Sequence, residues 1–194
     1  MEAASETWEP PMTVTVNVTY VSGTTRRSVD PMLAWANEHV YAQANITLVK
    51  GVEITLDEAQ SRAALGDWYP VMTEYGDSSD PTEAHKRLYR HLQTANAITV
   101  YFVQQLSQDS AGEAFSPSNE HGLTGADIGD KGTCQTVAHE IGHVLLNPGP
   151  HVPDERNLMH AKDGLEKTQL TSSQIERMRA SRFAVPAAGY NPFG

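Results

Sequence analysis

The most constraining feature of this sequence is a pair of histidines four residues apart, His139 and His143, with Glu140 next to the first. On a helix, residues four apart lie on the same face about one turn from each other, so both imidazoles can reach one ion. Glu140 is then displaced round the helix axis, toward a water bound to that ion. The apolar residues of the stretch fall on the opposite face: Val137, Ile141, Val144 and Leu145. The spacing therefore predicts a helix with a core-facing side and a metal-binding side.

A zinc ion that catalyses hydrolysis takes three protein ligands and keeps a fourth position open. The helix cannot continue through Pro148, so the Asn-Pro-Gly-Pro stretch at 147–150 predicts a helix stop and a sharp turn. That turn delivers His151, which is the first candidate for the third ligand. Three carboxylates remain as alternatives for this role: Asp154, Glu166 and Glu176.

These residues resemble the metzincin superfamily of zinc peptidases, and within it the matrixin-like branch. The resemblance is carried by residues 139–143, 151–154 and 157–160 and by the helix expected over 170–178. Metzincins have a methionine-containing turn beneath the metal, and Met159 follows His151 at the spacing of the matrixin-like pattern. The usual extended motif would place glycine at 146 and histidine at 149, where this chain has Leu146 and Gly149. The resemblance is specific over 136–178 and architectural before it.

The resemblance implies a zinc-dependent endopeptidase in which His139, His143 and His151 bind one catalytic zinc ion and Glu140 is the general base. The implied fold class is α+β, with a twisted mixed sheet, an active-site helix, the methionine turn and a C-terminal helix. Substrates of the family lie extended along an edge strand, which the resemblance places at 112–116. The expected partner is therefore a protein or peptide bound as an extended strand, and the chain is expected to be a monomer.

Two other interpretations stay open. A glutamate as third ligand, Glu166 or Glu176, would make the chain a gluzincin-like peptidase, in which zinc binding survives the loss of His151. A catalytically silent, zinc-stabilised binding module is the second. Glu140 argues against a purely structural site, because such a site usually fills the fourth position with protein and needs no carboxylate beside the metal.

Other candidate ligands are explained more simply. Asp127 and Asp130 lie in a glycine-rich stretch and could bind calcium, but turn formation accounts for them. His121 and His160 are isolated, and isolated histidines are more often surface or hydrogen-bonded groups than ligands. We therefore expect one zinc ion, with calcium unsupported.

Periodicity and turn residues predict a mixed sheet with helices between its strands. Strands are expected at 12–21, 46–56, 97–103, around 111–116 and around 123–128. Helices are expected at 30–43, within 57–81, at 82–95, over the histidine motif, and after Thr171, where Gln174 completes a capping box. Asp30 and Pro31 are predicted as the cap and first residue of the first helix, and Gly51 predicts a bulge in the second strand.

The length of 194 residues favours one domain. We expect a single catalytic domain over 1–194, with a sheet subdomain over about 10–146 and a small C-terminal subdomain over about 147–194. Hydrophobic residues make up 39% of the chain, which is enough for a packed core. The single cysteine, Cys134, excludes an internal disulfide.

Charge and hydropathy exclude two classes of partner. Lys plus Arg is 14 and Asp plus Glu is 24, giving a net charge of −10, so nucleic acid is an unfavourable partner. No stretch reaches the roughly 18 apolar residues of a membrane helix, and the N-terminus lacks the features of a signal peptide. We expect no membrane span; the location is left open, with export slightly favoured.

Overall fold

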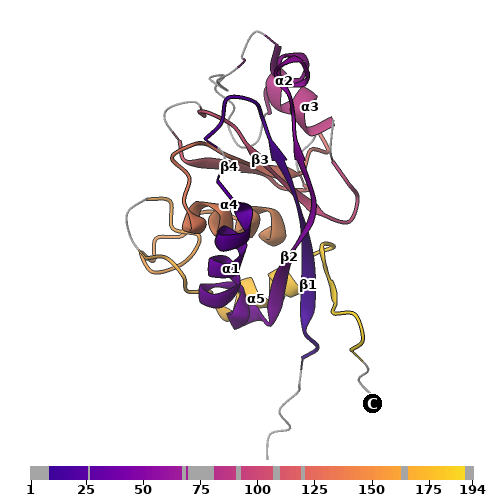
Figure 1. Cartoon of the computed structure of the whole chain (residues 1–194). Helices are drawn as coiled ribbons and strands as arrows, with labels where there is room; N and C mark the ends of the chain where they lie inside the picture. The colour runs from indigo at the N-terminus through magenta and orange to yellow at the C-terminus, as the bar shows by residue number, and fades with distance from the viewer. Residues whose placement is uncertain are drawn as a thin grey trace, which may run out of the picture.

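The computed structural model describes residues 9–25, 27–66, 69, 81–90, 93–106, 110–118, 121–162 and 166–190. Within these residues six strands form one mixed sheet in the order β2-β1-β3-β5-β4, with β6 beside β1. The strands are β1 (Met12–Tyr20), β2 (Ile46–Thr55), β3 (Ile98–Phe102), β4 (Gly112–Phe115), β5 (Gly125–Ile128) and β6 (Ala184–Pro186). β1, β2, β3 and β5 run parallel, whereas β4 and β6 are antiparallel to their neighbours. The expected mixed sheet is confirmed, and Figure 1 shows its twist.

β1 is an interior strand of the sheet. Its valines alternate with polar residues, and the face that carries the valines is completely buried. Val14, Val16 and Val18 are at most 1% exposed. β1 pairs with β2 on one side and with β3 and β6 on the other. The register between β1 and β2 shifts between Val16 and Val18, opposite Gly51, so the predicted bulge is confirmed.

Helices cover both faces of the sheet (Figure 1). They are α1 (Val29–His39), α2 (Glu58–Leu65), α3 (Glu83–Arg90), α4 (Cys134–Leu146) and α5 (Ser172–Arg179), with a 3₁₀ helix η1 (Tyr41–Ala44) after α1. α1, α4 and α5 pack with the sheet around the larger hydrophobic core, whereas α2 and α3 belong to a second core on the other face. β3 contributes to both, because Val100 lies in the first core and Tyr101 in the second.

The first helix differs from its prediction at both ends. Ser28, not Asp30, is the N-cap, and its side chain accepts a hydrogen bond from the backbone N–H of Asp30. Pro31 falls in the first turn, where its missing N–H costs no hydrogen bond. The α-helix ends at His39, and the remaining predicted residues form η1, which Asn45 ends in the left-handed conformation.

The second half of the sheet follows its predictions more closely. The strands predicted at 97–103, 111–116 and 123–128 are β3, β4 and β5. The helix predicted at 82–95 is α3, which is shorter; residues 91 and 92 lie outside the described part. The helix predicted within 57–81 is α2, and the rest of that stretch after it lies outside the described part, apart from residues 66, 69 and 81.

The C-terminal segment returns to the sheet. The predicted capping box of α5 is confirmed, because Thr171 Oγ1 accepts from the N–H of Gln174 and Gln174 Oε1 accepts from the N–H of Thr171. β6 then pairs with the start of β1, and the division into two subdomains stays a prediction. In the described residues, no helix combines the length and apolar character needed to cross a bilayer.

Candidate metal centre

α4 carries the histidine motif on a helix that is well capped and mostly buried. Thr133 and Thr136 exchange hydrogen bonds between side chain and backbone in a capping box. The four apolar residues predicted to face the core are at most 1% exposed, which confirms the prediction: Val137, Ile141, Val144 and Leu145. His139 and Glu140 are also buried, at 8% and 6% exposure. His143 on the same side of α4 is half-buried, so the rest of the fold covers this side only in part.

The structure brings His139, His143 and His151 together. The Nε2 atom of His139 lies 3.0 Å from that of His143 and 3.2 Å from that of His151, and 3.2 Å separates His143 Nε2 from His151 Nε2. In the part of the chain that the structure describes, this is the one group of at least three His, Cys, Asp or Glu side chains placed to hold a metal ion. His139 is buried and His151 is exposed, so the group is reached from solvent on the side of His151.

Backbone carbonyls determine which nitrogen of two rings faces the group. Nδ1 of His139 donates to the carbonyl of Leu158 at 2.6 Å, and Nδ1 of His143 donates to the carbonyl of Gly149 at 2.5 Å. A carbonyl can only accept, so the proton of each neutral ring is on Nδ1 and the Nε2 lone pair is free to bind a metal. Two lone pairs facing each other at 3.0 Å repel, and a shared cation removes that repulsion.

Burial keeps these rings neutral. It lowers the pKa of His139 to about 4 and that of His143 to about 3, and it lowers the pKa of His151 in the same direction. Neutral imidazole is the form that binds metal. The three histidines therefore need no deprotonation near neutral pH before an ion can bind.

The distances fit zinc. Ligands placed tetrahedrally at the usual zinc–nitrogen distance of about 2.0 to 2.1 Å lie about 3.3 Å apart. The three Nε2 separations of 3.0 to 3.2 Å are close to this value. Three neutral imidazoles without a fourth protein ligand in the group match a catalytic rather than a structural zinc site.

The turn after α4 brings His151 to the other two histidines despite the changed spacing. Asn147 ends α4 in the left-handed conformation, and its side-chain oxygen accepts the N–H of Ser118 at 2.7 Å. Beyond His151, the N–H of Val152 donates to the carbonyl of Met159 at 2.9 Å and closes the loop. The alternative third ligands lie exposed and outside the group: Asp154, Glu166 and Glu176.

Met159 lies against α4 at Gly142. Its side chain is fully buried, and a Cβ atom added to Gly142 would stand 2.9 Å from its sulfur. A side chain at position 142 would therefore require the side chain of Met159 to shift. The assignment of Met159 to a methionine turn beneath the metal stays a prediction.

Glu140 extends toward the edge of the sheet. A Cβ atom added to Gly112, the first residue of β4, would stand 2.7 Å from Glu140 Oε1. β4 pairs with β5 alone in the described residues, so it is an edge strand. The predicted general base and the predicted substrate strand are therefore in contact.

Sequence reasoning left His160 outside the site, but the structure places it nearby. His160 is 8% exposed, and its carbonyl accepts from Nζ of Lys167 at 2.8 Å. Besides burial, the charges of Lys167 and His160 lower the pKa values of His139 and His151. The position directly after Met159 was the signal that could have indicated this.

The two aspartates considered for calcium lie in different surroundings and bind different protein groups. Asp127 is not in a turn as predicted but inside β5, fully buried, where its Oδ2 accepts from the hydroxyl of Tyr89 at 2.9 Å. Asp130 accepts from the backbone and hydroxyl of Thr25 at the surface. Each side chain thus has its own protein partner, and calcium at this position gains no support.

Comparison with known proteins identifies the fold. No known family model matches the chain, and no curated protein matches it in sequence. Metalloproteinase-II from Bacteroides fragilis aligns with a TM-score of 0.57 at 16% identity, over 87% of this chain and 52% of its own. Archaemetzincin from Methanopyrus kandleri aligns with a TM-score of 0.52 at 12% identity, over 86% of this chain and 94% of its own. This chain therefore spans about half the length of the Bacteroides protein.

These likenesses concern the fold alone, because the identities are so low. The chain has a fold that a metalloproteinase and an archaemetzincin share, and it carries a histidine triad formed by α4 and the segment that follows it. They do not distinguish a matrixin-like branch from other branches.

Proposed function

We propose that this chain is a zinc-dependent endopeptidase. The observation that carries the proposal is the convergence of three Nε2 atoms within 3.2 Å of one another, two of them from the helix whose Glu140 carboxylate touches an edge strand. Such a centre combines a metal site, a proton acceptor and a surface for an extended chain. The shared fold of two metallopeptidase structures supports the same function.

His139, His143 and His151 would hold the ion. Zinc bound there supplies a Lewis acid that polarises a water molecule and the scissile carbonyl. Glu140 would accept the proton of the water as its oxygen adds to the scissile carbonyl carbon, and would then pass that proton to the leaving nitrogen as the carbon–nitrogen bond breaks. Glu140 is buried, so its carboxylate is held within the fold beside the proposed zinc site and does not move freely in solvent.

The substrate is proposed to bind as an extended strand on the free side of β4. Edge strands present unpaired N–H and C=O groups, which pair with the backbone of an added chain. Gly112 has no side chain to separate such a chain from Glu140. Affinity from backbone pairing depends little on the substrate's sequence, as suits a protein or peptide substrate.

The metzincin assignment belongs to this proposal, and it rests on the residue pattern together with the buried Met159 against Gly142. The matrixin-like branch rests on the spacing from His151 to Met159 alone. A gluzincin-like site is disfavoured, because His151 and not Glu166 or Glu176 stands in the group. A silent zinc-stabilised module is disfavoured by the position of Glu140.

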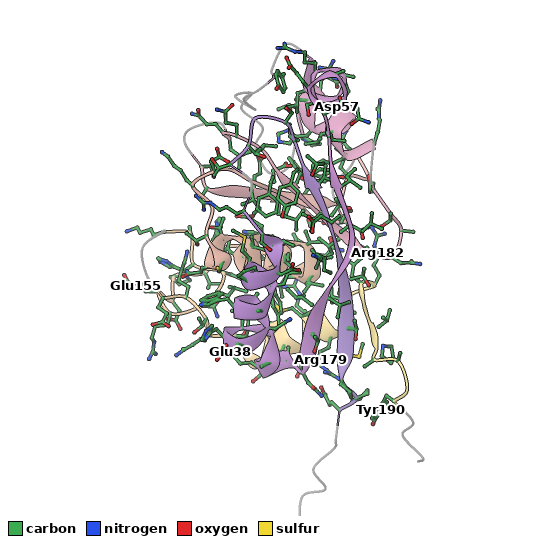
Figure 2. The ribbon with its side chains drawn as sticks, in the orientation of Figure 1. Glu38, Asp57, Glu155, Arg179, Arg182 and Tyr190 are labelled. Carbon is green, nitrogen blue, oxygen red and sulfur yellow. The ribbon has the colours of Figure 1, made fainter. Side chains whose placement is uncertain are left out.

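The decisive experiment compares the wild type with Glu140→Gln, which keeps the shape of the side chain and removes its basicity. Zinc content should be one per chain in both, and hydrolysis of casein or quenched peptides should fall by about 10²- to 10⁴-fold in the variant. Glu155→Gln is the matched control, since Glu155 is an exposed residue of the same loop region as His151 (Figure 2). Full activity of Glu140→Gln would contradict the assigned proton acceptor.

The third ligand has its own test. His151→Ala should abolish stoichiometric zinc binding, whereas Glu166→Ala and Glu176→Ala should retain it. A gluzincin-like site would show the reverse pattern, with zinc lost on removal of one glutamate. Zinc in the wild type without hydrolysis of any peptide in a broad library would support the silent binding module.

A further inference from the structure

Gln174 in α5 is paired with Asn157 through both of its amide atoms. Asn157 Nδ2 donates to Gln174 Oε1 at 2.8 Å, and Gln174 Nε2 donates to Asn157 Oδ1 at 3.0 Å. Both side chains are buried, at 8% and 2% exposure respectively. Because each amide satisfies the other away from solvent, α5 determines the orientation of Asn157.

Asn157 in turn fixes the peptide plane on which His139 depends. Its Oδ1 accepts the N–H of Met159 at 2.9 Å. That N–H belongs to the same planar peptide unit as the carbonyl of Leu158. The carbonyl of Leu158 is the acceptor for Nδ1 of His139. A rotation of this plane would therefore turn the ring of His139 away from the other two histidines.

Arg177 lies three residues further along α5 and binds the backbone of the segment that follows α4. Its Nη2 donates to the carbonyl of Leu146 and, at 2.7 Å, to the carbonyl of Pro148. Leu146 is the last residue of α4, where backbone carbonyls have no partner within the helix. Pro148 directly precedes Gly149, whose carbonyl accepts from Nδ1 of His143.

We propose that Gln174 and Arg177 are positioning residues of the metal centre, through which α5 orients the backbone carbonyls that hold His139 and His143. The inference rests on the proposed zinc centre, but not on peptidase activity. It also gives the unusual turn a physical support. The chain reaches His151 through Asn-Pro-Gly-Pro at 147–150, and Arg177 ties this turn to α5 from outside.

The same helix offers a matched control. Arg179 donates to the carbonyls of Ala44 and Pro10, both at 2.8 Å, and pairs with Glu9. Figure 2 shows it at the lower end of the sheet, where β1 begins, well separated from Glu155 in the histidine loop. Arg179 thus anchors the N-terminal part of the fold by the same chemistry, and these contacts lie outside both turns of the metal centre. Its loss should lower stability alone.

The test measures the zinc dissociation constant of the full chain by competition with a chromophoric chelator. Variants are Gln174→Leu, Arg177→Met, Arg177→Lys and Arg179→Met. Outer-shell partners of metal ligands typically contribute about 10- to 100-fold in affinity, so Gln174→Leu and Arg177→Met should weaken zinc binding by about that factor. Arg177→Lys should recover part of the loss. Arg179→Met should lower the melting temperature of the metal-free chain but keep zinc affinity within about twofold of the wild type.

A second readout separates positioning from general destabilisation. Cobalt(II) replaces zinc in the same chains, and its visible absorption reports the arrangement of the ligands. We expect altered spectra for Gln174→Leu and Arg177→Met and the wild-type spectrum for Arg179→Met. Equal zinc affinities and equal spectra in all variants would overturn the proposal. If Gln174→Leu fails to fold, Arg177→Met at its exposed position decides alone. If the wild type binds no zinc, the proposed metal centre is wrong. If the wild type binds zinc and the variants bind it equally well, only the positioning role of Gln174 and Arg177 is wrong.

Discussion

A histidine triad and a second cluster, formed by one histidine and two carboxyl groups, lie on opposite faces of the sheet, with β4 between them. On one face, Gly112 contacts Glu140 beside the triad of His139, His143 and His151. On the other, the next residue of β4, Glu113, has its Oε2 3.5 Å from Nε2 of His85 in α3. Asp127 of β5 stands directly across from Glu113 in the ladder, and its Oδ2 is also 3.5 Å from that nitrogen.

The two clusters differ in which ring nitrogen carries the proton. In the triad, backbone carbonyls accept hydrogen bonds from the Nδ1–H groups of His139 and His143. The Nε2 lone pairs of these two rings therefore face one another. In the second cluster, the N–H of Thr82 donates to Nδ1 of His85 at 3.2 Å, so the proton lies on Nε2 and points at carboxylates. The backbone group opposite Nδ1 thus decides whether a buried histidine is suited to a cation or to an anion.

The charges differ accordingly. The triad contains no carboxylate and is complete only with a cation. The second cluster supplies its own anions, one of which is held partly protonated. Burial raises the pKa of Asp127 to about 7; His85 and the hydrogen bond from Tyr89 oppose the rise, and Glu113 adds to it.

Metal removal should produce the largest difference between the clusters. With zinc about a thousandfold above its dissociation constant, binding stabilises the folded state by about 4 kcal/mol. Adding a chelator should therefore lower the melting temperature of the wild type and of His85→Leu by similar amounts, and that of His151→Ala hardly at all. Calorimetry with and without chelator measures this. An equal response in His151→Ala would show that the ion binds elsewhere.

The triad was largely predictable from sequence because its members are local. His139, Glu140 and His143 follow from helical periodicity, and Pro148 ends the helix at the right place to bring in His151. The carbonyls of Leu158 and Gly149 were not predictable, because the direction of a backbone group depends on how distant segments pack. The same is true of Gln174 and Arg177, which meet the site only after α5 has docked.

The second cluster was not foreseen at all. His85, Glu113 and Asp127 come from a helix and two strands, with no spacing that relates them. Asp127 was predicted as a turn residue from the glycines around it, although the short strand β5 buries it completely. Sequence periodicity predicts elements, but it does not show which side chains two neighbouring strands place opposite each other.

Removing the imidazole of the second cluster should be the next largest effect. His85→Leu leaves Glu113 and Asp127 facing each other without the group between them. Leaving a buried polar group without its partner costs about 1 to 3 kcal/mol. Urea unfolding of the metal-free chain at pH 8 measures the loss. His39→Leu, at a histidine 39% exposed, is the control and should change stability little; a similarly small change in His85→Leu would mean that the carboxylates do not depend on it.

The clusters should also affect the pH dependence of stability in opposite directions. The pKa of Asp127 rises from 3.8 to about 7 on folding, so between these values the folded state holds a proton that the unfolded state has released. Stability from Asp127 therefore falls as pH rises, by about 1.4 kcal/mol per pH unit. The pKa values of His139 and His143 fall from 6.5 to about 4 and about 3, so the unfolded state holds the extra protons and stability rises with pH up to about 6.5.

Between pH 4.5 and 6 the two histidines outweigh the aspartate, and metal-free stability should rise with pH. Asp127→Asn removes the opposing contribution, so the rise should steepen by about 1.4 kcal/mol per pH unit. His143→Gln should flatten it. Urea unfolding in chelator at several pH values measures the slopes. The groups that face Asp127, namely Glu113, His85 and Tyr89, are unchanged in both variants, and an unaltered slope in Asp127→Asn would mean that this aspartate is ionised in the folded state throughout.

The smallest effect should come from the hydroxyl that supports Asp127. Tyr89 donates to Asp127 Oδ2 at 2.9 Å, and both side chains are fully buried. Tyr89→Phe should therefore cost about 1 kcal/mol, the usual net value of one hydrogen bond. Because this hydrogen bond lowers the pKa of Asp127, its loss should raise that pKa further, and the cost should be greater at pH 8 than at pH 5. Tyr101→Phe is the matched control. The Tyr101 hydroxyl donates to the carbonyl of Tyr89 at 3.4 Å, so its removal keeps the hydrogen bond from Tyr89 to Asp127. A cost for Tyr89→Phe that is equal at both pH values would mean that the hydroxyl does not distinguish the ionised from the neutral carboxyl group, and that the second cluster is held by packing more than by charge.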